Sequence, residues 1–350
     1  MSFTKHLLFA MALCLWACAG PRTPETLSDL IPLFTADNVP ETGPAEDTNI
    51  GENFAWMSDK VTDPAWPGEG LSRYPMLYIG EGYNRILLVD KGEVVWKYDT
   101  GPGWELGDIW MLRDGSILFS RQTFAAKVTP DKREVWRYDC QDGEELHTLQ
   151  PIGKDLAFML VNKKPSGRVV MFNHNTGEVL WEHTLDFPNS STHGQSRRMR
   201  YTNEGTWLLS YISEAKVVEF DKDWNIIWQY DCRQPWSAVR LKNGNTLISM
   251  ERDRKVIEVN KAKETVWELD LDEIPEPYRP GKCQTVVRLN NGNTILCARG
   301  TSGSGAQLVE VTPDKQVVWA VEDWKHLGPV TAVQILSEPG WSENPGDFGR

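Results

Sequence analysis

The chain has 350 residues, of which 49 are acidic, 37 are Lys or Arg and 40% are hydrophobic, so its formal charge is -12. This composition is typical of a folded soluble protein and excludes a disordered or membrane-embedded chain. The sequence has no basic cluster that could displace the counterions of a phosphate backbone, so we expect no nucleic-acid partner.

The first residues have the pattern of a secretory signal. An apolar run at positions 7–16 follows a lysine and a histidine, and it is too short to span a bilayer, so we expect residues 1–17 to be a signal peptide. Leu-Trp-Ala-Cys at 15–18 resembles a bacterial lipobox, in which Cys18 carries a lipid anchor. Ala-Cys-Ala at 17–19 is also typical of a peptidase site, which would leave a secreted protein.

The next segment is acidic and contains no Lys or Arg between Arg22 and Lys60. Because such a composition buries little apolar surface, we expect residues 18–50 to be a flexible acidic tether. Aromatic residues return at 51–73, which predicts an N-terminal extension that packs on the main domain; a longer linker is the alternative.

A tryptophan recurs in one setting through the rest of the chain, as in Val-Trp-Lys-Tyr-Asp at 95–99 and Val-Trp-Arg-Tyr-Asp at 135–139. The spacing of about 40–50 residues, with short alternating strands, is typical of a β-propeller in which each repeat is one four-stranded blade. We expect each tryptophan to pack as a wedge between neighbouring blades. The six are Trp96, Trp136, Trp181, Trp228, Trp267 and Trp319.

The fifth repeat has the clearest pattern, with an Asn243-Gly244 hairpin of type I′ and expected strands at 237–241, 246–250, 255–259 and 265–269. The first repeat lacks the inner strand, having strands only at 76–79, 85–90 and 93–98.

Residues 331–336 resemble the inner strand of the fifth repeat, so we expect them to close blade one from the other end of the chain. The predicted fold is an all-β, six-bladed β-propeller over residues 74–336, with four-stranded blades. Residues 337–350 then form a C-terminal tail, and removal of 338–350 should be tolerated.

The Val-Trp-x-Tyr-Asp blade ends, together with Leu-x-Asn-Gly-Asn-Thr-Leu at 241–247, resemble the quinoprotein-like propellers and most closely their arylsulfotransferase-like group. The resemblance covers residues 74–336 and specifies fold better than chemistry. Quinone-dependent members have eight blades, adjacent cysteines and a calcium site, so six repeats without adjacent cysteines argue against a quinone cofactor. Arylsulfotransferases use a channel histidine as nucleophile, but Gly-Asp-Ile at 107–109 stands where His-Asp-Val is expected.

In a propeller the inner strands line a central channel, and the loops that enter them form one mouth of it. Alignment on the hairpins places at equivalent entry positions Asp108, His147, Arg197, Ser237, Thr285 and Thr331, with Trp236 and Gln284 just before. The same loops carry Glu105, Glu144, Glu145, His193, Arg198, Lys282 and His326. We expect ligand contacts from Asp108, Arg197, Arg198, Trp236, Gln284, Lys282 and His326.

His147 and His193 are the candidate catalytic residues, because an imidazole can act as base, nucleophile or metal ligand near neutral pH. The sequence has no His-Glu-x-x-His or Cys-x-x-Cys motif and predicts no metal site, although separate blades could assemble one. Cys232 and Cys283 lie on neighbouring loops and could form a disulfide. His174 and His183, on an outer hairpin, are expected to be solvated.

Two functions follow from these features. In the first, the protein is exported to the cell envelope, held there by a lipid anchor, and binds a glycan, a small anionic molecule or an envelope protein at the channel mouth. In the second, it is an envelope enzyme, arylsulfotransferase-like or carbohydrate-active, that uses His147 and His193 with Arg197. The residues identify no cofactor, and we expect a monomer.

Overall fold

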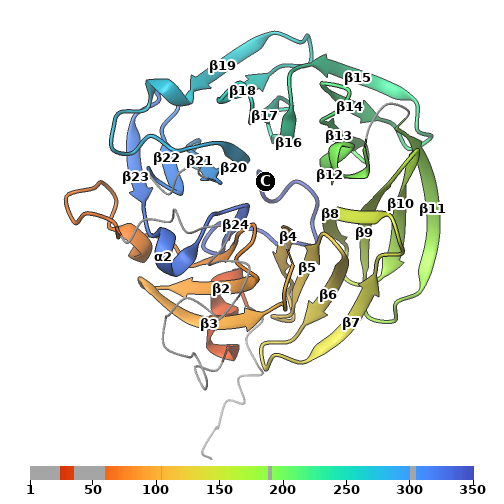
Figure 1. Cartoon of the computed structure of the whole chain (residues 1–350), viewed down its shortest axis with the longest axis horizontal. Coiled ribbons are helices and arrows are strands. Elements are labelled where there is room, and N and C mark those ends of the chain that lie inside the picture. Colours follow the sequence, from red (N-terminus) through yellow and green to blue (C-terminus); the bar gives the residue numbers. More distant parts are fainter. Residues whose placement is uncertain (1–23, 35–59, 104, 188–190, 300–304) are drawn as a thin grey trace, which may run out of the picture.

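The computed structural model describes residues 24–34, 60–103, 105–187, 191–299 and 305–350. Within these residues, six four-stranded antiparallel sheets form a ring around a central axis (Figure 1). The inner strands contact one another around this axis, so they enclose the channel. The six-bladed propeller predicted from the sequence is confirmed.

From the centre outward, blade one has strands β24 (Ala332–Ile335), β1 (Met76–Ile79), β2 (Arg85–Asp90) and β3 (Glu93–Asp99), and blade two has β4 (Leu106–Met111), β5 (Ile117–Arg121), β6 (Phe124–Val128) and β7 (Glu134–Asp139). Blade three has β8 (Glu144–Ile152), β9 (Leu156–Lys163), β10 (Ser166–Asn173) and β11 (Val179–Asp186), and blade four has β12 (Ser196–Tyr201), β13 (Trp207–Tyr211), β14 (Lys216–Phe220) and β15 (Ile226–Asp231). Blade five has β16 (Pro235–Arg240), β17 (Thr246–Met250), β18 (Lys255–Val259) and β19 (Thr265–Asp270), and blade six has β20 (Cys283–Arg288), β21 (Thr294–Ala298), β22 (Leu308–Val311) and β23 (Val317–Val321). Short helices are η1 (Leu27–Leu33), η2 (Gly70–Ser72), η3 (Thr192–Gly194), η4 (Leu271–Glu273) and α2 (Trp324–Leu327).

The hairpin between the first two strands of blade five forms where the Asn243-Gly244 pair predicted it, but with a different turn. In blade five only Gly244 has a positive φ, of 84°. Its N–H donates to the Leu241 carbonyl, which is the pattern of a type I turn followed by a glycine bulge and not of the predicted type I′ turn. On either side of the turn, β16 ends at Arg240, one residue before the predicted end, and β17 begins at Thr246 as predicted, because both turns reverse the chain at the same glycine.

Blade one is closed as predicted. Strand β24 pairs antiparallel with β1, with Met76 opposite Ile335 and Ile79 opposite Ala332. This pairing joins strands from opposite ends of the propeller sequence and leaves no open edge next to the channel.

The recurring tryptophans join neighbouring blades, as the wedge interpretation predicts. Four indole N–H groups donate to a main-chain carbonyl of the following blade or, for the last, of η2. These hydrogen bonds run from Trp96 to Pro130 (2.8 Å), from Trp228 to Lys261 (3.2 Å), from Trp267 to Pro313 (2.8 Å) and from Trp319 to Gly70 (2.6 Å). Each indole thus buries apolar surface between two sheets and satisfies its polar atom there.

The other two tryptophans make ring contacts across the same interface. Trp136 of blade two stacks on Phe172 of blade three with centroids 4.5 Å apart. Trp181 of blade three lies 5.8 Å from Trp207 of blade four, but it is 38% exposed, whereas Trp96 and Trp319 are fully buried. The wedge is therefore weakest between blades three and four.

Part of the predicted flexible tether is ordered, so the tether prediction is wrong for residues 24–34. Helix η1 buries Leu27 and Leu30, and the Phe34 ring lies 5.2 Å from the Trp96 indole. Apolar residues at this spacing give the segment one apolar face, which the average composition of the acidic stretch conceals. The remaining tether residues, 18–23 and 35–50, lie outside the described residues, as do 1–17 and 51–59.

The described part of the N-terminal extension, residues 60–73, packs on blade six and its neighbours. Val61 forms a β-bridge with Asp323, and the Trp66 ring lies 5.2 Å from Tyr278. The Trp319 hydrogen bond to Gly70 ties η2 to β23.

The C-terminal segment is not a dispensable tail. It runs to the centre of the ring in Figure 1, where Arg350 is 6% exposed. Ser342 Oγ donates to the Met111 carbonyl of β4 (2.6 Å), and the Arg288 N–H of β20 donates to the Gly349 carbonyl (2.7 Å). The segment fills one end of the channel, a role that its loop-like composition does not indicate.

We expect Trp96→Ala and Trp228→Ala each to lower the free energy of unfolding by about 3–5 kcal/mol, because each empties a buried aromatic site. Trp181→Ala should cost less, since this indole is 38% exposed. Urea unfolding of the three variants measures the difference, and equal small losses would contradict the wedge.

We expect deletion of residues 338–350 to lower the free energy of unfolding by about 2 kcal/mol or more, which is about 4 °C in Tm, since buried hydrogen-bonding groups of β4 and β20 lose their partners. Deletion of 329–350 also removes β24 and should leave no folded propeller. Differential scanning calorimetry separates these outcomes. A shorter deletion that melts like the full chain would show that the segment contributes nothing to the channel.

Candidate functional site

In the described part of the chain, five of the six inner strands contain a β-bulge at the same mouth of the channel. In blade two, Leu106 pairs with Arg121 and Asp108 with Ser120, so Gly107 has no partner. A bulge re-aims side chains and is common beside binding sites. The bulged residues of blades two to six are Gly107, His147, Arg197 with Arg198, Trp236 and Gln284.

This register corrects the alignment made from the sequence. His147 is equivalent to Gly107, Trp236 and Gln284, whereas Asp108 comes one residue later and pairs normally. Because successive side chains of a strand point to opposite faces, a shift of one position changes where a residue points. Gly107 is required for a separate reason, since a Cβ there would lie 2.7 Å from the His147 carbonyl oxygen.

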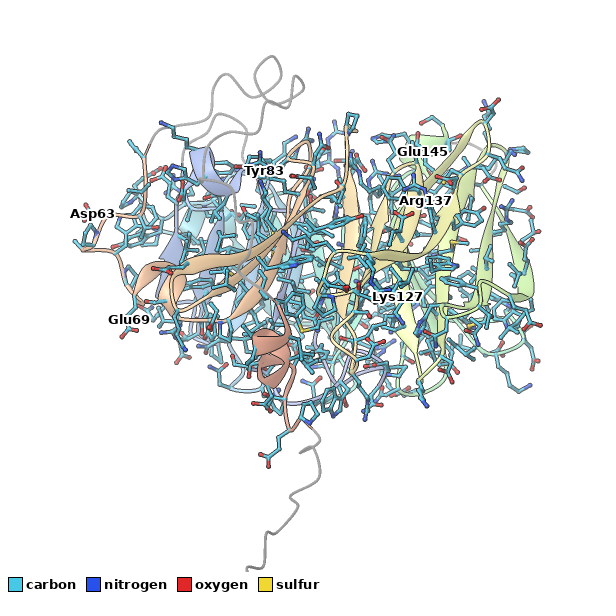
Figure 2. All side chains as sticks on the ribbon, turned by 90° about the horizontal axis from the view of Figure 1, so that it is seen from below. Asp63, Glu69, Tyr83, Lys127, Arg137 and Glu145 are labelled. Carbon is cyan, nitrogen blue, oxygen red and sulfur yellow. The ribbon has the colours of Figure 1, made fainter. Side chains whose placement is uncertain are left out.

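Two histidines and two glutamates form a closed ring at this mouth. Glu105 Oε2 lies 2.8 Å from His147 Nδ1, and His147 Nε2 lies 3.2 Å from Glu145 Oε2. Glu145 Oε2 lies 2.8 Å from His193 Nδ1, and His193 Nε2 returns to Glu105 Oε1 at 3.4 Å. The labelled Glu145 places this ring at the upper face of Figure 2, opposite η1. The structure thus confirms that His147 and His193 lie together.

The ring stabilises charge on its carboxylates. Burial alone raises the pKa of Glu105, but the neighbouring imidazoles and the Arg197 guanidinium bring it down to about 2. Burial likewise opposes the effect of both imidazoles at Glu145, whose pKa lies well below its usual value. The hydrogen bond to Glu145 raises the pKa of His193. Both glutamates are therefore ionised near neutral pH.

Arg197 and Trp236 form the adjoining wall of the mouth. The Arg197 guanidinium lies over the Trp236 ring, 4.8 Å from its centroid, and Nη2 is 2.8 Å from His193 Nε2. Its Nε atom is buried and has no hydrogen-bond partner among the described residues. The same holds for Arg198 Nη2 and Thr331 Oγ1.

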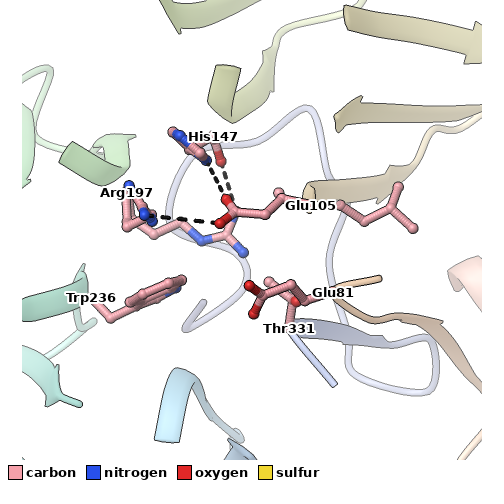
Figure 3. A pocket seen from close by; sticks show the side chains of 9 residues that line it. Glu81, Glu105, His147, Arg197, Trp236 and Thr331 are labelled. Carbon is pink, nitrogen blue, oxygen red and sulfur yellow. Dashed lines mark hydrogen bonds and ion pairs between the residues drawn. The ribbon is translucent and has the colours of Figure 1, made fainter. Parts of the chain in front are cut away.

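These groups surround one small pocket with a cavity volume of about 10 Å³ (Figure 3). Its lining is Glu81, Glu105, Leu106, Gly107, His147, Arg197, Arg198, Trp236 and Thr331. Pockets that bury a drug-sized ligand measure about 300–1,000 Å³. This pocket suits a small polar group or an ion better than an extended sugar.

Below the mouth, Asp108 is the centre of a buried ionic network and not a mouth residue. Its carboxylate is fully buried and lies 2.8 Å from Arg198, 2.7 Å from Arg200 and 3.4 Å from Arg350. Burial alone would raise the pKa of Asp108, but the three guanidinium groups together have the larger, opposite effect, so the pKa lies below its usual value. Burial lowers the pKa of Arg350 to about 9. The role of Asp108 is structural, and Arg198 links this network to the pocket.

The other residues predicted to contact a ligand do not line the pocket. Gln284 is fully buried and donates from Nε2 to Glu81 Oε2 (3.1 Å). His326 lies on α2 and pairs with Asp323, the residue before this helix (2.9 Å), and it does not line the pocket. Lys282 does not line it either, although its carbonyl accepts the Arg299 N–H.

Sequence reasoning assigned no role to the three glutamates of the mouth. The sequence predicts that Glu105 and Glu145 lie in connecting loops, where a carboxylate is usually solvated, and it gives no signal for Glu81. Glu81 pairs with Arg299 (2.8 Å), and burial raises its pKa despite this partner. The spacing of Glu145 two residues before His147 was the available signal, because alternate strand residues share a face.

Two further predictions are wrong. His174 is 1% exposed, with Nδ1 3.4 Å from Lys127 Nζ, because the lower end of blade three packs against blade two. Cys232 and Cys283 are free thiols, Cys283 being buried within blade six. His183 is partly buried and stacks on Trp224 with centroids 3.9 Å apart. Across the described ranges, we find no helix with the length and apolar character that a membrane crossing requires.

Comparison with known proteins agrees with this architecture. The structure of a protein of unknown function from Bacteroides caccae is 24% identical, with a TM-score of 0.69 over 76% of this chain and 99% of that chain. A streptogramin B lyase structure is 14% identical, with a TM-score of 0.51 over 74% of this chain and 85% of that chain. At these identities the likeness shows the fold alone. No curated protein matches the sequence.

The family model PQQ_2, described as outer membrane protein assembly factor BamB, matches residues 68–203 and 165–320. These two matches overlap and together span the propeller from the end of the N-terminal extension to β23. They bear out the quinoprotein-like resemblance and do not test its arylsulfotransferase-like branch. The chain belongs to the BamB-like family of propeller repeat proteins.

Proposed function

We propose that this protein is an exported envelope protein whose propeller binds a small oxyanion-bearing ligand at the channel mouth. One observation carries the proposal: three buried donors of one pocket, Arg197 Nε, Arg198 Nη2 and Thr331 Oγ1, have no partner within the described ranges. A buried donor without a partner costs about 1–3 kcal/mol. An oxygen acceptor of a ligand would recover this free energy.

The charges below the pocket favour an anion. In the network beneath it, the Asp108 side chain faces the guanidinium groups of Arg198, Arg200 and Arg350. The nearby carboxylates of Glu81 and Glu105 are each offset by a cation, Arg299 and Arg197 respectively. Charge-assisted hydrogen bonds from arginine are among the strongest that a carboxylate or sulfate can accept.

Binding without turnover agrees with the description of the matching family, whose assembly role is a binding role.

The signal-like start and the lipobox-like 15–18 segment support attachment to the envelope through Cys18. The outer-membrane location in the description of the matching family agrees with this address. The ligand is then a molecule of the envelope space.

We expect Cys18→Ala to release the protein from the membrane fraction, because the thiol that would carry the lipid is lost. Fractionation of cells that express the native and the variant chain measures this. Membrane retention of Cys18→Ala at the native level would refute the anchor, and Ala19→Ser serves as the matched control.

We expect sulfate or acetate to bind the full chain in the presence of EDTA, and Arg197→Ala to weaken this binding by about 30-fold, or about 2 kcal/mol, through loss of a charge-assisted bond. Thr331→Val should weaken it less, by one neutral hydrogen bond. Isothermal titration calorimetry at constant ionic strength is the measurement. Thr265→Val, on the outer strand β19, should change nothing, and equal losses in all variants would exclude this mouth.

A further inference from the structure

We propose that Glu105, His147 and His193 form a binding site for a divalent transition-metal cation of the Zn²⁺ class, with Glu145 as the carboxylate that orients both imidazoles. The site uses the ring at the channel mouth, beside the three donors of the anion site. It does not depend on anion binding, and each can be tested alone.

The donor atoms are close enough for one ion. One donor atom from each of Glu105, His147 and His193 lies within 4.8 Å of the others. Zn²⁺ binds nitrogen and oxygen ligands at about 2.0–2.2 Å, so two of its ligands are at most about 4.4 Å apart. Side-chain shifts of less than about 1 Å therefore bring the three donors to an ion.

Glu145 provides the outer contact that metal-binding imidazoles usually make. Its Oε2 atom lies 3.2 Å from His147 Nε2 and 2.8 Å from His193 Nδ1. If both nitrogens donate to this carboxylate, the lone pairs of His147 Nδ1 and His193 Nε2 point toward Glu105. A carboxylate that accepts the outer N–H fixes the tautomer and orients the ring of a metal ligand.

His147 Nδ1 lacks an alternative partner. It is buried and, although 2.8 Å from Glu105 Oε2, makes no hydrogen bond among the described residues. The side chain as a whole is 3% exposed. A lone pair on Nδ1 that faces a carboxylate oxygen at this distance is repelled, so the contact requires a cation, either a proton on Nδ1 or a metal ion held by both groups.

The three ligands come from three consecutive blades. Glu105 directly precedes β4, His147 is the bulged residue of β8, and His193 lies in η3 before β12. The inner strands β4, β8 and β12 contact one another in this order. His193 is 50% exposed, so an ion can enter from solvent on its side.

The ligand types select the kind of ion. Two imidazoles and a carboxylate suit Zn²⁺ and other first-row transition metals, whereas Ca²⁺ and Mg²⁺ prefer oxygen ligands. With neutral imidazoles, Glu105 and Glu145 give the ring two negative charges, and Arg197 offsets one of them. The remaining charge favours a divalent cation.

Arg197 competes with the ion. Its Nη2 atom lies 2.8 Å from His193 Nε2, so it occupies one of the lone pairs that the metal needs. Its charge also opposes a second cation. Loss of Arg197 should therefore strengthen metal binding, although the same change should weaken anion binding.

The test is titration of the full, EDTA-stripped chain with Zn²⁺ by calorimetry, with Co²⁺ absorption as a second reading of the ligand set. We expect one Zn²⁺ per chain. Glu105→Gln and His147→Gln should each weaken binding by 100-fold or more, and Glu145→Gln by about 10–100-fold. Arg197→Ala should bind Zn²⁺ at least as tightly as the native chain.

His183→Gln, on the outer strand β11, is the matched control and should bind like the native chain. The melting temperature of each metal-free variant shows whether it is folded; if His147→Gln does not fold, Glu105→Gln, which keeps the side-chain shape, decides. No stoichiometric Zn²⁺ binding, or equal affinity in His147→Gln and His183→Gln, would overturn the site. Sulfate binding in EDTA with no Zn²⁺ binding would remove this site and leave the proposed function intact.

Discussion

The channel depends on the ion pairs that the buried Asp108 carboxylate makes with three arginines. A ring of six blades leaves a central space lined by main chain and polar side chains, and this space must be filled with satisfied groups. Asp108 holds Arg198 and Arg200 from blade four and Arg350 from the C-terminal segment around one point. Removing one partner of such a cluster leaves buried charges uncompensated, which is far more costly than the cluster is stabilising.

The arrangement of the mouth follows from this centre. Arg197 and Arg198 are adjacent in the bulge of β12, yet Arg198 points down to Asp108 and Arg197 contacts His193. The ionic network therefore fixes the position of Arg198. Because Arg197 is the neighbouring residue of the same bulge, its side chain is then held at the pocket. The C-terminal segment, by closing the far end of the channel, leaves the upper mouth as the open side of this cluster.

The blades were predictable from the sequence because their signals are local: alternating strands, a glycine in the first hairpin of blades two to six and a tryptophan in the outer strand. The site was only partly predictable. The approach of His147 to His193 follows from blade order. A bulge, however, shifts the register by one residue, so Asp108 lies inside the channel and not at the mouth where it was predicted. The partners of both histidines are Glu105, in the loop before β4, and Glu145, near the start of β8, and neither belongs to a repeated motif.

The bulges also explain how a repeated fold carries a site without symmetry. The outer parts of the blades must repeat, because the indoles of Trp96, Trp228 and Trp267 each need a carbonyl in the next blade. A bulged residue pairs with no strand residue, so the contacts between blades do not require a particular side chain there. Glycine, histidine, arginine, tryptophan and glutamine can then occupy equivalent places in successive blades. Charge is thereby divided around the mouth, with carboxylates on blades one to three, imidazoles on blades three and four, and unpartnered donors on β12 and before β24.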